Sequence, residues 1–356
     1  MRNDCKAAGA RLLIYAAVPD EKLLEQGFYA AEAAGLRSHP RVRQVRLTNR
    51  LSEVARGEYD GLISFFYSHS AVAALLARLR RRPAIVTGGG EQLFPELAGS
   101  RWIYLARISA FRATALIASR ILATSTSDLK RMRKTAWFGQ SRLELSFHGA
   151  PAADTVEVGT PLQDRPPASF VTICGLDTSL NVKRKGIPEA LRLLSRIAPQ
   201  CPAARLTIIG RTTCRDMVEK QARELGVAER VFFAGYVGEK DKLAILRSHR
   251  YYVQLSVYEG FGIGALEALS QGCQVIHSGV GGLIDTIADF GVVLSHEEID
   301  DFSLAALPDY AGSSDDRLVR HLSTFRPVAR ANAVIYALFG RQSSVSADPV
   351  QKLADG

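Results

Sequence analysis

The chain has 356 residues, of which 47% are hydrophobic and 23% are charged. These proportions are typical of a soluble globular protein, and the length exceeds what one hydrophobic core usually holds, so we expect two domains. No stretch of about 18 uncharged apolar residues is present, which excludes a membrane-spanning helix. Residues 1–10 contain no apolar run, so we expect no secretory signal. The five cysteines are scattered without a C-x-x-C pair, which indicates reduced thiols and a cytoplasmic location.

The net charge of +9 is unevenly distributed. Residues 1–150 contain 23 Lys and Arg against 12 Asp and Glu, whereas residues 151–356 contain 22 against 24. A basic half joined to a nearly neutral half predicts an anionic partner for the first half, either nucleic acid or an anionic membrane surface. The alternative is a basic surface that serves solubility alone. No nucleic-acid-binding motif is present, so we expect no nucleic-acid partner.

The first 150 residues alternate between β-rich and helical patterns. The predicted strands are Arg11–Val18, Val42–Leu47, Leu62–Phe66, Ala84–Thr87, Ile121–Ser125 and Leu143–Phe147. The predicted helices are Lys22–Ala34, Ala71–Arg81, Ile103–Ser119 and Ser127–Lys134. The segment Gly149–Ala168 follows, and its four prolines indicate an interdomain linker.

The second half repeats the alternation more regularly. Predicted strands are Phe170–Gly175, Arg205–Gly210, Val231–Gly235, Tyr251–Ser256, Cys273–Gly279 and Gly291–Ser295. Predicted helices are Glu189–Ile197, Asp216–Leu225, Lys240–Arg247 and Ala265–Ser270. Short buried strands alternating with helices predict α/β domains with parallel sheets, in which ligands bind beyond the carboxyl ends of the strands. The polar segment 341–356 is expected to be a frayed tail.

One segment combines glycines and carboxylates at a strand-to-helix junction. Between Ser256 and Gly272, glycines at 260, 262 and 264 allow a ligand to approach the backbone. A helix that begins here would present free amides, which bind anions. Glu259 on the loop and Glu267 in the early helix can face the same crevice, and a carboxylate with two acceptor oxygens suits a sugar diol.

This segment, S-x-x-E-G-F-G-x-x-x-L-E-A, resembles the signature of glycosyltransferase family 4, whose members are retaining enzymes with the GT-B fold. Weaker similarities to that family occur at 69–76, 142–149, 207–210, 231–235 and 332–339. The resemblance implies two Rossmann-like domains that face a central cleft. Residues 1–150 would bind the acceptor, 151–320 would bind the nucleotide sugar, and a helix within 321–340 would cross back to the first domain.

The resemblance also implies roles for individual residues. Glu259 and Lys185 would be the catalytic residues, and Glu267 would hold the ribose hydroxyls. The remaining donor-binding candidates are Phe261, Gly262, Ile263, Gly264, Arg184, Tyr236 and Val237. The backbone at Phe261 and Gly262 would face the sugar, the amides of Ile263 and Gly264 would hold the diphosphate, and Tyr236 and Val237 would lie near the base.

Four positions depart from the family pattern. Gly264 and Gln274 each replace a common Pro. Leu176 stands where many members carry a phosphate-binding Arg, and Gly89 is nearest to the place of a His that touches the donor sugar. Glu91 and His69 are the candidates for a polar group on the acceptor side.

The implied reaction is transfer from a UDP- or GDP-linked sugar to a lipid-linked or polysaccharide precursor. Negative charge grows on the leaving diphosphate and must be stabilised. The chain contains no Asp-x-Asp to hold a divalent metal, so Lys185, Arg184 and the helix amides are expected to supply the positive charge, without a metal or another cofactor. Peripheral association with the inner face of a membrane is expected through Leu75–Arg82 and Arg101–Arg120. The alternatives are a small-molecule acceptor, an epimerase or phosphorylase on the same architecture, and a non-catalytic nucleotide-sugar-binding protein.

Overall fold

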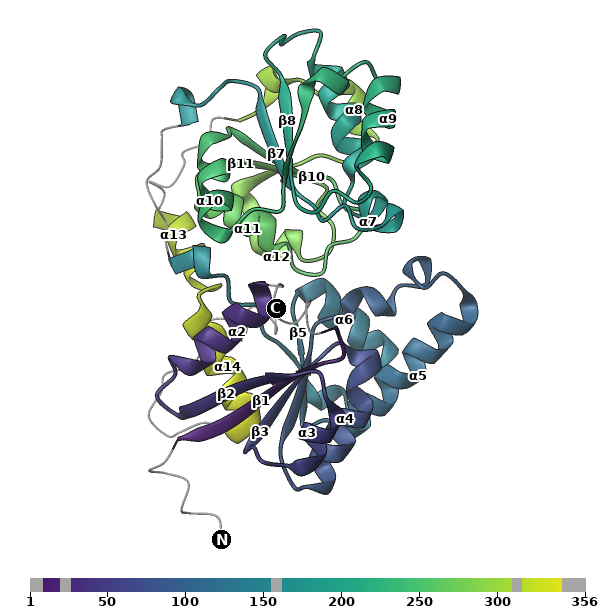
Figure 1. The fold of residues 1–356 in the computed structure, drawn as a ribbon, viewed down its shortest axis with the longest axis vertical. Coiled ribbons are helices and arrows are strands. Elements are labelled where there is room, and N and C mark those ends of the chain that lie inside the picture. Colours follow the sequence, from purple (N-terminus) through teal and green to yellow (C-terminus); the bar gives the residue numbers. More distant parts are fainter. Residues whose placement is uncertain (1–8, 20–26, 155–161, 309–315, 341–356) are drawn as a thin grey trace. The chain divides into compact units, whose positions relative to one another are not determined.

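The computed structural model describes residues 9–19, 27–154, 162–308 and 316–340. The chain divides into two compact units, here called unit 1 and unit 2, and each is described by itself (Figure 1). Unit 1 comprises the described residues of Met1–Pro151 and Ser323–Gly356, and unit 2 comprises those of Ala152–Leu322. Among the described residues, no helix is both long enough and apolar enough to cross a membrane.

Unit 1 contains a parallel sheet with strand order β2-β1-β3-β4-β5-β6. Its strands are β1 Ala10–Ala16, β2 Val42–Thr48, β3 Gly61–Phe65, β4 Ala84–Thr87, β5 Arg120–Ala123 and β6 Leu143–Leu145. Its helices are α2 Gly27–Arg37, α3 Leu51–Arg56, α4 Tyr67–Leu79, α5 Arg101–Ile117, α6 Thr126–Thr135 and α14 Pro327–Phe339. All six predicted strands are therefore present, and no end differs from the prediction by more than two residues.

Alternation along the strands divides the core of unit 1 into two layers. In β1, Leu13 and Tyr15 pack with side chains of α4 and α5 on one face of the sheet. Leu12 and Ile14 pack with α2 and α14 on the opposite face. Successive side chains of a strand point to opposite faces, so one short apolar strand supplies both layers. Helix α14 thus belongs to the core of unit 1, although some 180 residues separate it in sequence from the last strand of that sheet.

A buried ion pair fastens α14 to this unit. Arg330 is 3% exposed, and its Nε lies 3.0 Å from Oε1 of Glu32 in α2. The same guanidinium donates to the backbone carbonyl and hydroxyl of Ser146 and to the hydroxyl of Thr87. These hydrogen bonds occupy all three guanidinium nitrogens, and a buried charge is tolerated only when it is paired in this way.

Unit 2 contains a second parallel sheet, with strand order β12-β11-β10-β7-β8-β9. Its strands are β7 Ser169–Ile173, β8 Arg205–Ile209, β9 Val231–Gly235, β10 Tyr251–Gln254, β11 Gln274–His277 and β12 Gly291–Val293. Its helices are α7 Ser179–Arg184, α8 Ile187–Ile197, α9 Arg215–Glu224, α10 Glu239–Ser248, α11 Ile263–Ser270, α12 Leu283–Ile287 and α13 Asp316–Ser323. The predicted strands and helices are again present, and the shorter helices α7, α12 and α13 were not predicted.

Some predictions concern residues outside the described parts. The predicted first helix begins at Lys22, whereas the described part of that helix begins at Gly27. Much of the predicted linker and the whole of the tail 341–356 also lie outside the described residues. Within the linker, Arg165 is buried and donates to the carbonyls of His249 and Gln271. The end of the linker is therefore held by the C-terminal ends of α10 and α11 in unit 2 and is not solvated along its whole length.

Candidate functional site

The strand order of unit 2 locates a crevice from topology alone. β7 is the first strand of the sheet in sequence and lies between β10 and β8. The strands β8 and β9 follow on one side of it, and β10, β11 and β12 then follow on the other. Ligands of such sheets bind at this switch point, beyond the carboxyl ends of the two strands where the order reverses. The segments that follow β7 and β10 are residues 174–186 and 255–262, and they contain five of the ten predicted catalytic and donor-binding residues.

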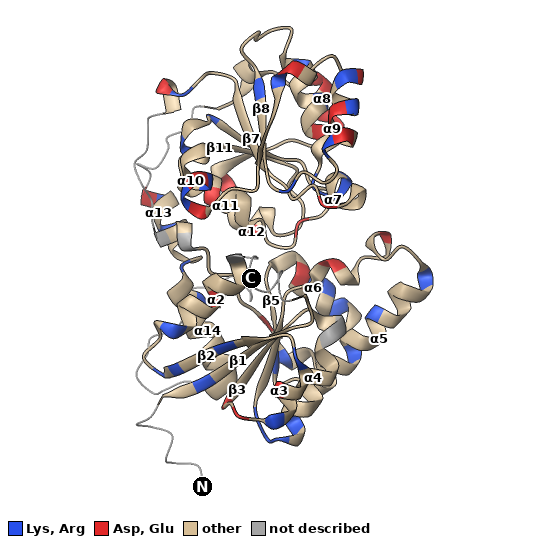
Figure 2. Ribbon diagram, in the orientation of Figure 1, with Lys and Arg blue, Asp and Glu red and all other residues tan. Residues whose placement is uncertain are grey.

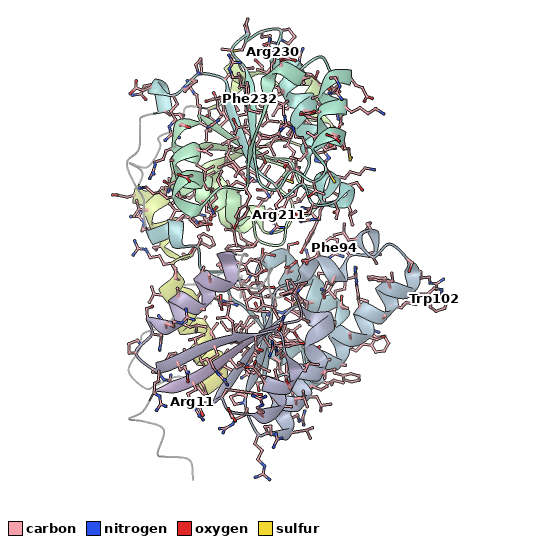
Figure 3. All side chains as sticks on the ribbon, in the orientation of Figure 1. Arg11, Phe94, Trp102, Arg211, Arg230 and Phe232 are labelled. Atoms are coloured by element: carbon pink, nitrogen blue, oxygen red, sulfur yellow. The ribbon has the colours of Figure 1, made fainter. Side chains whose placement is uncertain are left out.

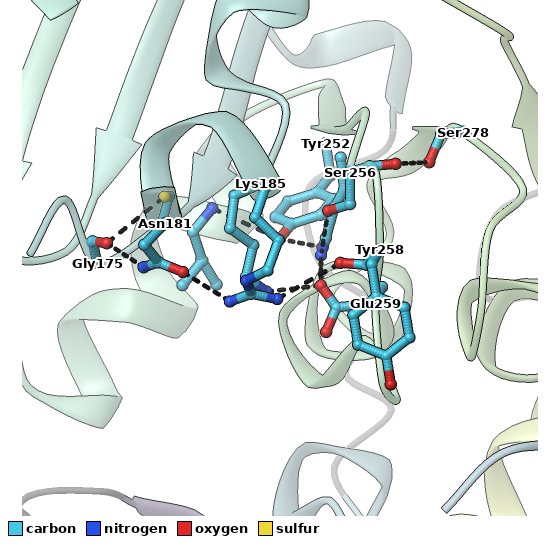
Figure 4. A network of polar contacts seen from close by, with 12 residues as sticks. Gly175, Asn181, Lys185, Tyr252, Ser256, Tyr258, Glu259 and Ser278 are labelled. Carbon is cyan, nitrogen blue, oxygen red and sulfur yellow. Dashed lines mark hydrogen bonds and ion pairs between the residues drawn. The ribbon is translucent and has the colours of Figure 1, made fainter. Parts of the chain in front are cut away.

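Lys185 and Glu259 meet at this switch point (Figure 4). The Lys185 ammonium lies 2.6 Å from Oε2 of Glu259, and the two side chains are only 20% and 10% exposed. Lys185 follows the short helix α7, and the next residue, Gly186, has a φ of +70°. A Cβ at position 186 would overlap the carbonyl oxygen of Leu255, so the chain approaches β10 this closely only with glycine. The glycine therefore brings the lysine to the glutamate.

The Glu259 carboxylate has a second partner on β10. The amide of Gln254 donates to Oε2 of Glu259, and the Tyr252 hydroxyl donates to the side-chain oxygen of Gln254 at 2.9 Å. The Tyr252 hydroxyl in turn accepts from the backbone amide of Ile173 in β7. This chain of hydrogen bonds runs from a backbone amide of β7 through two buried side chains of β10, and it holds the carboxylate in one orientation.

The environment of Glu259 keeps it ionised. Burial by itself raises the pKa of this carboxyl, but Lys185, Arg184 and the Gly262 amide together lower the pKa below its ordinary value. At neutral pH, Glu259 is thus a carboxylate beside an ammonium. Such a pair can accept hydrogen bonds from sugar hydroxyls through the carboxylate and offer positive charge to a phosphate through the lysine.

Backbone contacts hold the loop that carries Glu259. The Arg184 guanidinium donates to the carbonyl of Tyr258 at 3.4 Å and to Oδ1 of Asn181 at 2.6 Å, and the amide of Val257 donates to the Arg184 carbonyl. On the other side, the amide of Gly282 donates to the Glu259 carbonyl at 2.8 Å. Arg184 thus fixes the loop as well as adding positive charge near Glu259.

The N-terminus of α11 lies directly after this loop. Its N-cap residue is Gly262, with a φ of +92°, and no side chain caps the helix. Gly264 packs against the Tyr252 hydroxyl, where a Cβ would approach to 2.7 Å. The amides of Ile263 and Gly264 are in the first turn, where no helix carbonyl precedes them, and this arrangement suits an anion. The Phe261 side chain is buried, so its backbone is the part that could face a ligand.

Glu267, one turn further along α11, has a different partner from Glu259. Its Oε1 lies 2.9 Å from the ammonium of Lys242 in α10, which also lies 2.8 Å from Glu239. Burial raises the pKa of Glu267 despite Lys242. Burial lowers the pKa of Lys242, but the two carboxylates outweigh it and the net pKa is raised. The lysine therefore stays charged and neutralises a glutamate that is costly to ionise.

Tyr236 and Leu176 have contrasting environments. Tyr236 follows β9 and is 67% exposed, with the Arg211 guanidinium 5.9 Å from the centre of its ring. An exposed aromatic ring beside an arginine is suited to stacking on a planar base. Val237 follows it and is half-buried. The Leu176 side chain is fully buried in the core of unit 2.

The acceptor-side candidates belong to unit 1. Glu91 is half-buried in a short 3-10 turn, Gly90–Leu93, that follows β4. Its neighbour Gly90 packs on the carboxylate of the buried Asp128, where no Cβ would fit. His69 is in the first turn of α4, and its side chain is outside the part that the structure describes.

Sequence reasoning missed four residues that support the site, namely Asn181, Tyr252, Gln254 and Lys242. A signal was available for Gln254, because a glutamine within the otherwise apolar strand Tyr251–Gln254 is a buried polar group that needs a partner. None was available for Lys242, because Glu239 three residues earlier is an ordinary helix-surface partner for it. Within the described residues, no group of three or more His, Cys, Asp or Glu side chains is arranged to hold a metal ion.

Comparison with known proteins identifies the family. The family described as "Glycosyl transferases group 1" matches residues 181–307, which include Lys185, Glu259 and Glu267. A GDP-mannose:cellobiosyl-diphosphopolyprenol alpha-mannosyltransferase from Xanthomonas campestris is 30% identical over 276 residues, which cover 75% of this chain and 68% of the relative. The chain belongs to the group 1 glycosyl transferases. The resemblance to glycosyltransferase family 4 is therefore confirmed.

Other similarities to this glycosyltransferase are shorter or concern the fold. An uncharacterized glycosyltransferase from Methanocaldococcus jannaschii is 38% identical over 104 residues, which cover 29% of this chain and only 26% of the relative. The crystal structure of Anabaena HepE in complex with UDP and glucose has a TM-score of 0.62 and 15% identity, covering 97% of this chain and 98% of that one. These comparisons and the two parallel six-stranded sheets confirm an α/β protein of the GT-B class.

Proposed function

We propose that this glycosyltransferase moves a sugar from a nucleotide-diphosphate donor to a lipid-linked or polysaccharide precursor, with retention of anomeric configuration and without a metal. The observation that carries the proposal is the convergence of Lys185, Glu259 and the α11 N-terminus at the switch point of unit 2. Glu259 supplies acceptor oxygens for the sugar, and Lys185 and the amides of Ile263 and Gly264 face the diphosphate.

The charge balance explains how this site would act. As the bond between the anomeric carbon and the phosphate oxygen breaks, negative charge grows on the leaving diphosphate. The ammonium of Lys185 is paired with Glu259, so an incoming phosphate would compete with the carboxylate for the lysine. The Arg184 guanidinium, which adds to the positive potential at Glu259, raises the local attraction for a diphosphate.

Glu267 completes the donor site in this proposal. Its carboxylate, fixed by Lys242, would accept hydrogen bonds from the ribose diol, and Tyr236 would stack on the base. The Xanthomonas relative acts with GDP-mannose on a diphosphopolyprenol acceptor, and the HepE structure contains UDP. We therefore propose GDP- or UDP-linked donors and a diphosphate-linked lipid as the first acceptor class to test.

Thermal unfolding with a panel of nucleotides and nucleotide sugars tests donor binding. A ligand at 100 times its dissociation constant stabilises the protein by about 2.7 kcal/mol, which is readily detected. Response to one base and not to the others identifies the donor nucleotide. No response to any nucleotide would contradict the proposal.

Three further measurements test the reaction. Proton NMR of the product measures the anomeric configuration, and inversion would refute the retaining step. Activity should survive EDTA, since positive charge comes from the protein. The Lys185→Ala variant should lose roughly 10²–10³-fold in turnover, as expected when a group that stabilises transition-state charge is removed. The matched control is Lys183→Ala, two residues away and exposed, which should transfer sugar at the parental rate.

A further inference from the structure

Two helices and a loop of unit 1 expose an unusual number of large apolar side chains. We call this surface the apolar face, and its members are Val72, Leu75, Leu79, Trp102, Leu105, Leu116, Trp137 and Phe138. The three most exposed are Trp102, at 79%, and Leu79 and Trp137, at 70% each. Figure 3 shows Trp102 at the outer end of α5, pointing away from the rest of unit 1.

The exposed apolar residues of α5 share one face of the helix. Ile108, Phe111 and Ala115 form the buried face that packs on the sheet side. Trp102, Leu105 and Leu116 lie at helical spacing on the opposite face, where a solvated helix normally carries polar residues. In α4, Val72, Leu75 and Leu79 repeat the pattern opposite the buried Ala73 and Ala77.

Contacts of two arginines link α5 to α4 and to the loop that carries Trp137. The Arg78 guanidinium of α4 donates to the carbonyl of Leu116 in α5 at 3.4 Å. The Arg112 guanidinium of α5 lies 3.6 Å above the centre of the Trp137 ring. Helix α5 thus contacts both α4 and the Trp137 loop, and Figure 1 shows α4 and α5 packed side by side.

The elements that form the apolar face are strongly basic. Residues 61–143 contain 13 Lys and Arg against three Asp and Glu. One of these three acids, Asp128, is buried. Figure 2 shows the basic residues distributed along α5 and α6 with few acidic residues between them. The surface therefore presents apolar side chains within a positive field.

We propose that the apolar face docks on an anionic lipid bilayer, with Trp102, Trp137 and the leucines in the interface and the basic residues against the headgroups. Aromatic and aliphatic side chains combined with Lys and Arg are the composition that binds an interface, through buried apolar area together with attraction to anionic lipid. The aliphatic side chains have no counterpart on nucleic acid, which offers phosphates and base edges. A second copy presenting the same face would oppose two basic surfaces.

Two arginines of the predicted membrane-contact segment Leu75–Arg82 have other partners in the structure. Arg82 lies 3.6 Å from Asp60, and the Arg80 guanidinium donates to the carbonyl of Ala55. These two arginines are engaged at the α3 side of unit 1 instead of at the apolar face. Arg101 and Lys134 are exposed and lie close in sequence to the two tryptophans, so they are the better choices for neutralisation.

Tryptophan fluorescence provides a direct test, because the chain contains only two tryptophans and both are in the apolar face. The full chain is mixed with vesicles of phosphatidylglycerol and phosphatidylcholine, or of phosphatidylcholine alone. Sedimentation should show binding to the anionic vesicles, with a blue shift of the emission and quenching by brominated acyl chains. Part of the binding should persist at high salt, because the apolar contribution is not screened.

Two variants separate the apolar contribution to vesicle binding from the electrostatic one. Trp102→Ala should weaken vesicle binding roughly tenfold through lost apolar burial, and its 79% exposure leaves the fold unaffected. The double variant Arg101→Gln/Lys134→Gln should weaken binding about 30-fold at low salt and much less at high salt, since each basic residue contributes about fivefold at an anionic surface. Phe232→Ala, an exposed aromatic of unit 2, is the matched control and should bind as the parent does.

Several outcomes would overturn the proposal. These are recovery in the supernatant with every vesicle, vesicle binding without a change in tryptophan emission, and parental binding by the Trp102→Ala variant. A blue shift that appears with protein concentration in the absence of lipid would assign the face to a second copy, and displacement of vesicles by an oligonucleotide would assign it to nucleic acid. The proposal uses no residue of the donor site, and vesicle binding is measured without sugar transfer. The membrane proposal and the proposed function can therefore be refuted independently of each other. Nucleotide binding by the Trp102→Ala variant should be unchanged.

Discussion

Replacing Lys242 with methionine removes one charge from the buried pair that holds Glu267. The substitution keeps the apolar stem of the side chain, which is 13% exposed, and leaves the carboxylate of Glu267, 7% exposed, without its cation 2.9 Å away. Lys240, in the same helix, is exposed, so Lys240→Met is a matched control.

The magnitude follows from the distance and the burial. Two unit charges 2.9 Å apart attract by about 6 kcal/mol at an effective dielectric constant of about 20. Desolvation offsets part of this attraction, and breaking a buried pair by removing one partner typically costs about 3–5 kcal/mol. We expect about 3 kcal/mol, because Glu267 can take up a proton to relieve the unpaired charge.

That proton gives the variant a characteristic pH dependence. Burial already raises the pKa of Glu267, and loss of Lys242 raises it further. A protonated Glu267 has lost part of its capacity to accept hydrogen bonds from a ribose diol, so nucleotide binding should weaken at pH 7 by about tenfold or more. Raising the pH restores the carboxylate, so the defect should shrink at pH 8.5.

Calorimetric unfolding and nucleotide titration at the two pH values measure both effects. The double variant Lys242→Met/Glu267→Gln replaces the ion pair with neutral groups and should recover most of the lost stability, although not nucleotide affinity. The reasoning is refuted if Lys242→Met unfolds like Lys240→Met, or if the double variant is no more stable than the single one.

Three further predictions concern other parts of the chain. Arg330→Met leaves Glu32 buried and unpaired, so unit 1, which contains both tryptophans, should lose about 3–5 kcal/mol when unfolding is followed by fluorescence. Burial lowers the pKa of His277 to about 4, so the unfolded chain binds the extra proton below pH 6.5; this residue alone should lower stability by about 2 kcal/mol between pH 7 and pH 5, and His277→Asn should remove that share. The share of His148, whose pKa burial lowers to about 3, should remain in the variant. Gly186→Ala places a Cβ against the Leu255 carbonyl and should weaken nucleotide binding more than tenfold by displacing the adjacent lysine, as measured by titration.

Each of these predictions has a contradicting outcome. Loss of less than 1 kcal/mol in Arg330→Met would show that α14 is held by its apolar contacts alone. An unchanged pH profile in His277→Asn would mean that other groups titrate in this range. Parental nucleotide affinity in Gly186→Ala would show that the backbone at this turn can shift without moving Lys185.

Much of the fold was predictable because its signals are local. Strands such as Val231–Gly235 are short apolar runs that end in glycine, and helices such as Ile187–Ile197 carry apolar residues at helical spacing. The short helices α7 and α12, of six and five residues, escaped prediction because one and a half turns do not display a period. Their place is set by the loops that they connect, and therefore by the tertiary structure.

The amino-acid sequence by itself determined the two α/β domains and the Glu259–Glu267 segment, since residue type and spacing carry that information. It did not reveal which side chains meet across the sheet. Lys185 and Glu259 are 74 residues apart, and their pairing depends on β7 lying beside β10 and on the glycine that brings the two chain segments together. Only the tertiary structure assigned different cations to the two glutamates and showed that the apolar side chains of α4 and α5 point outward. A period in the sequence defines a helix face but not the side that the sheet covers.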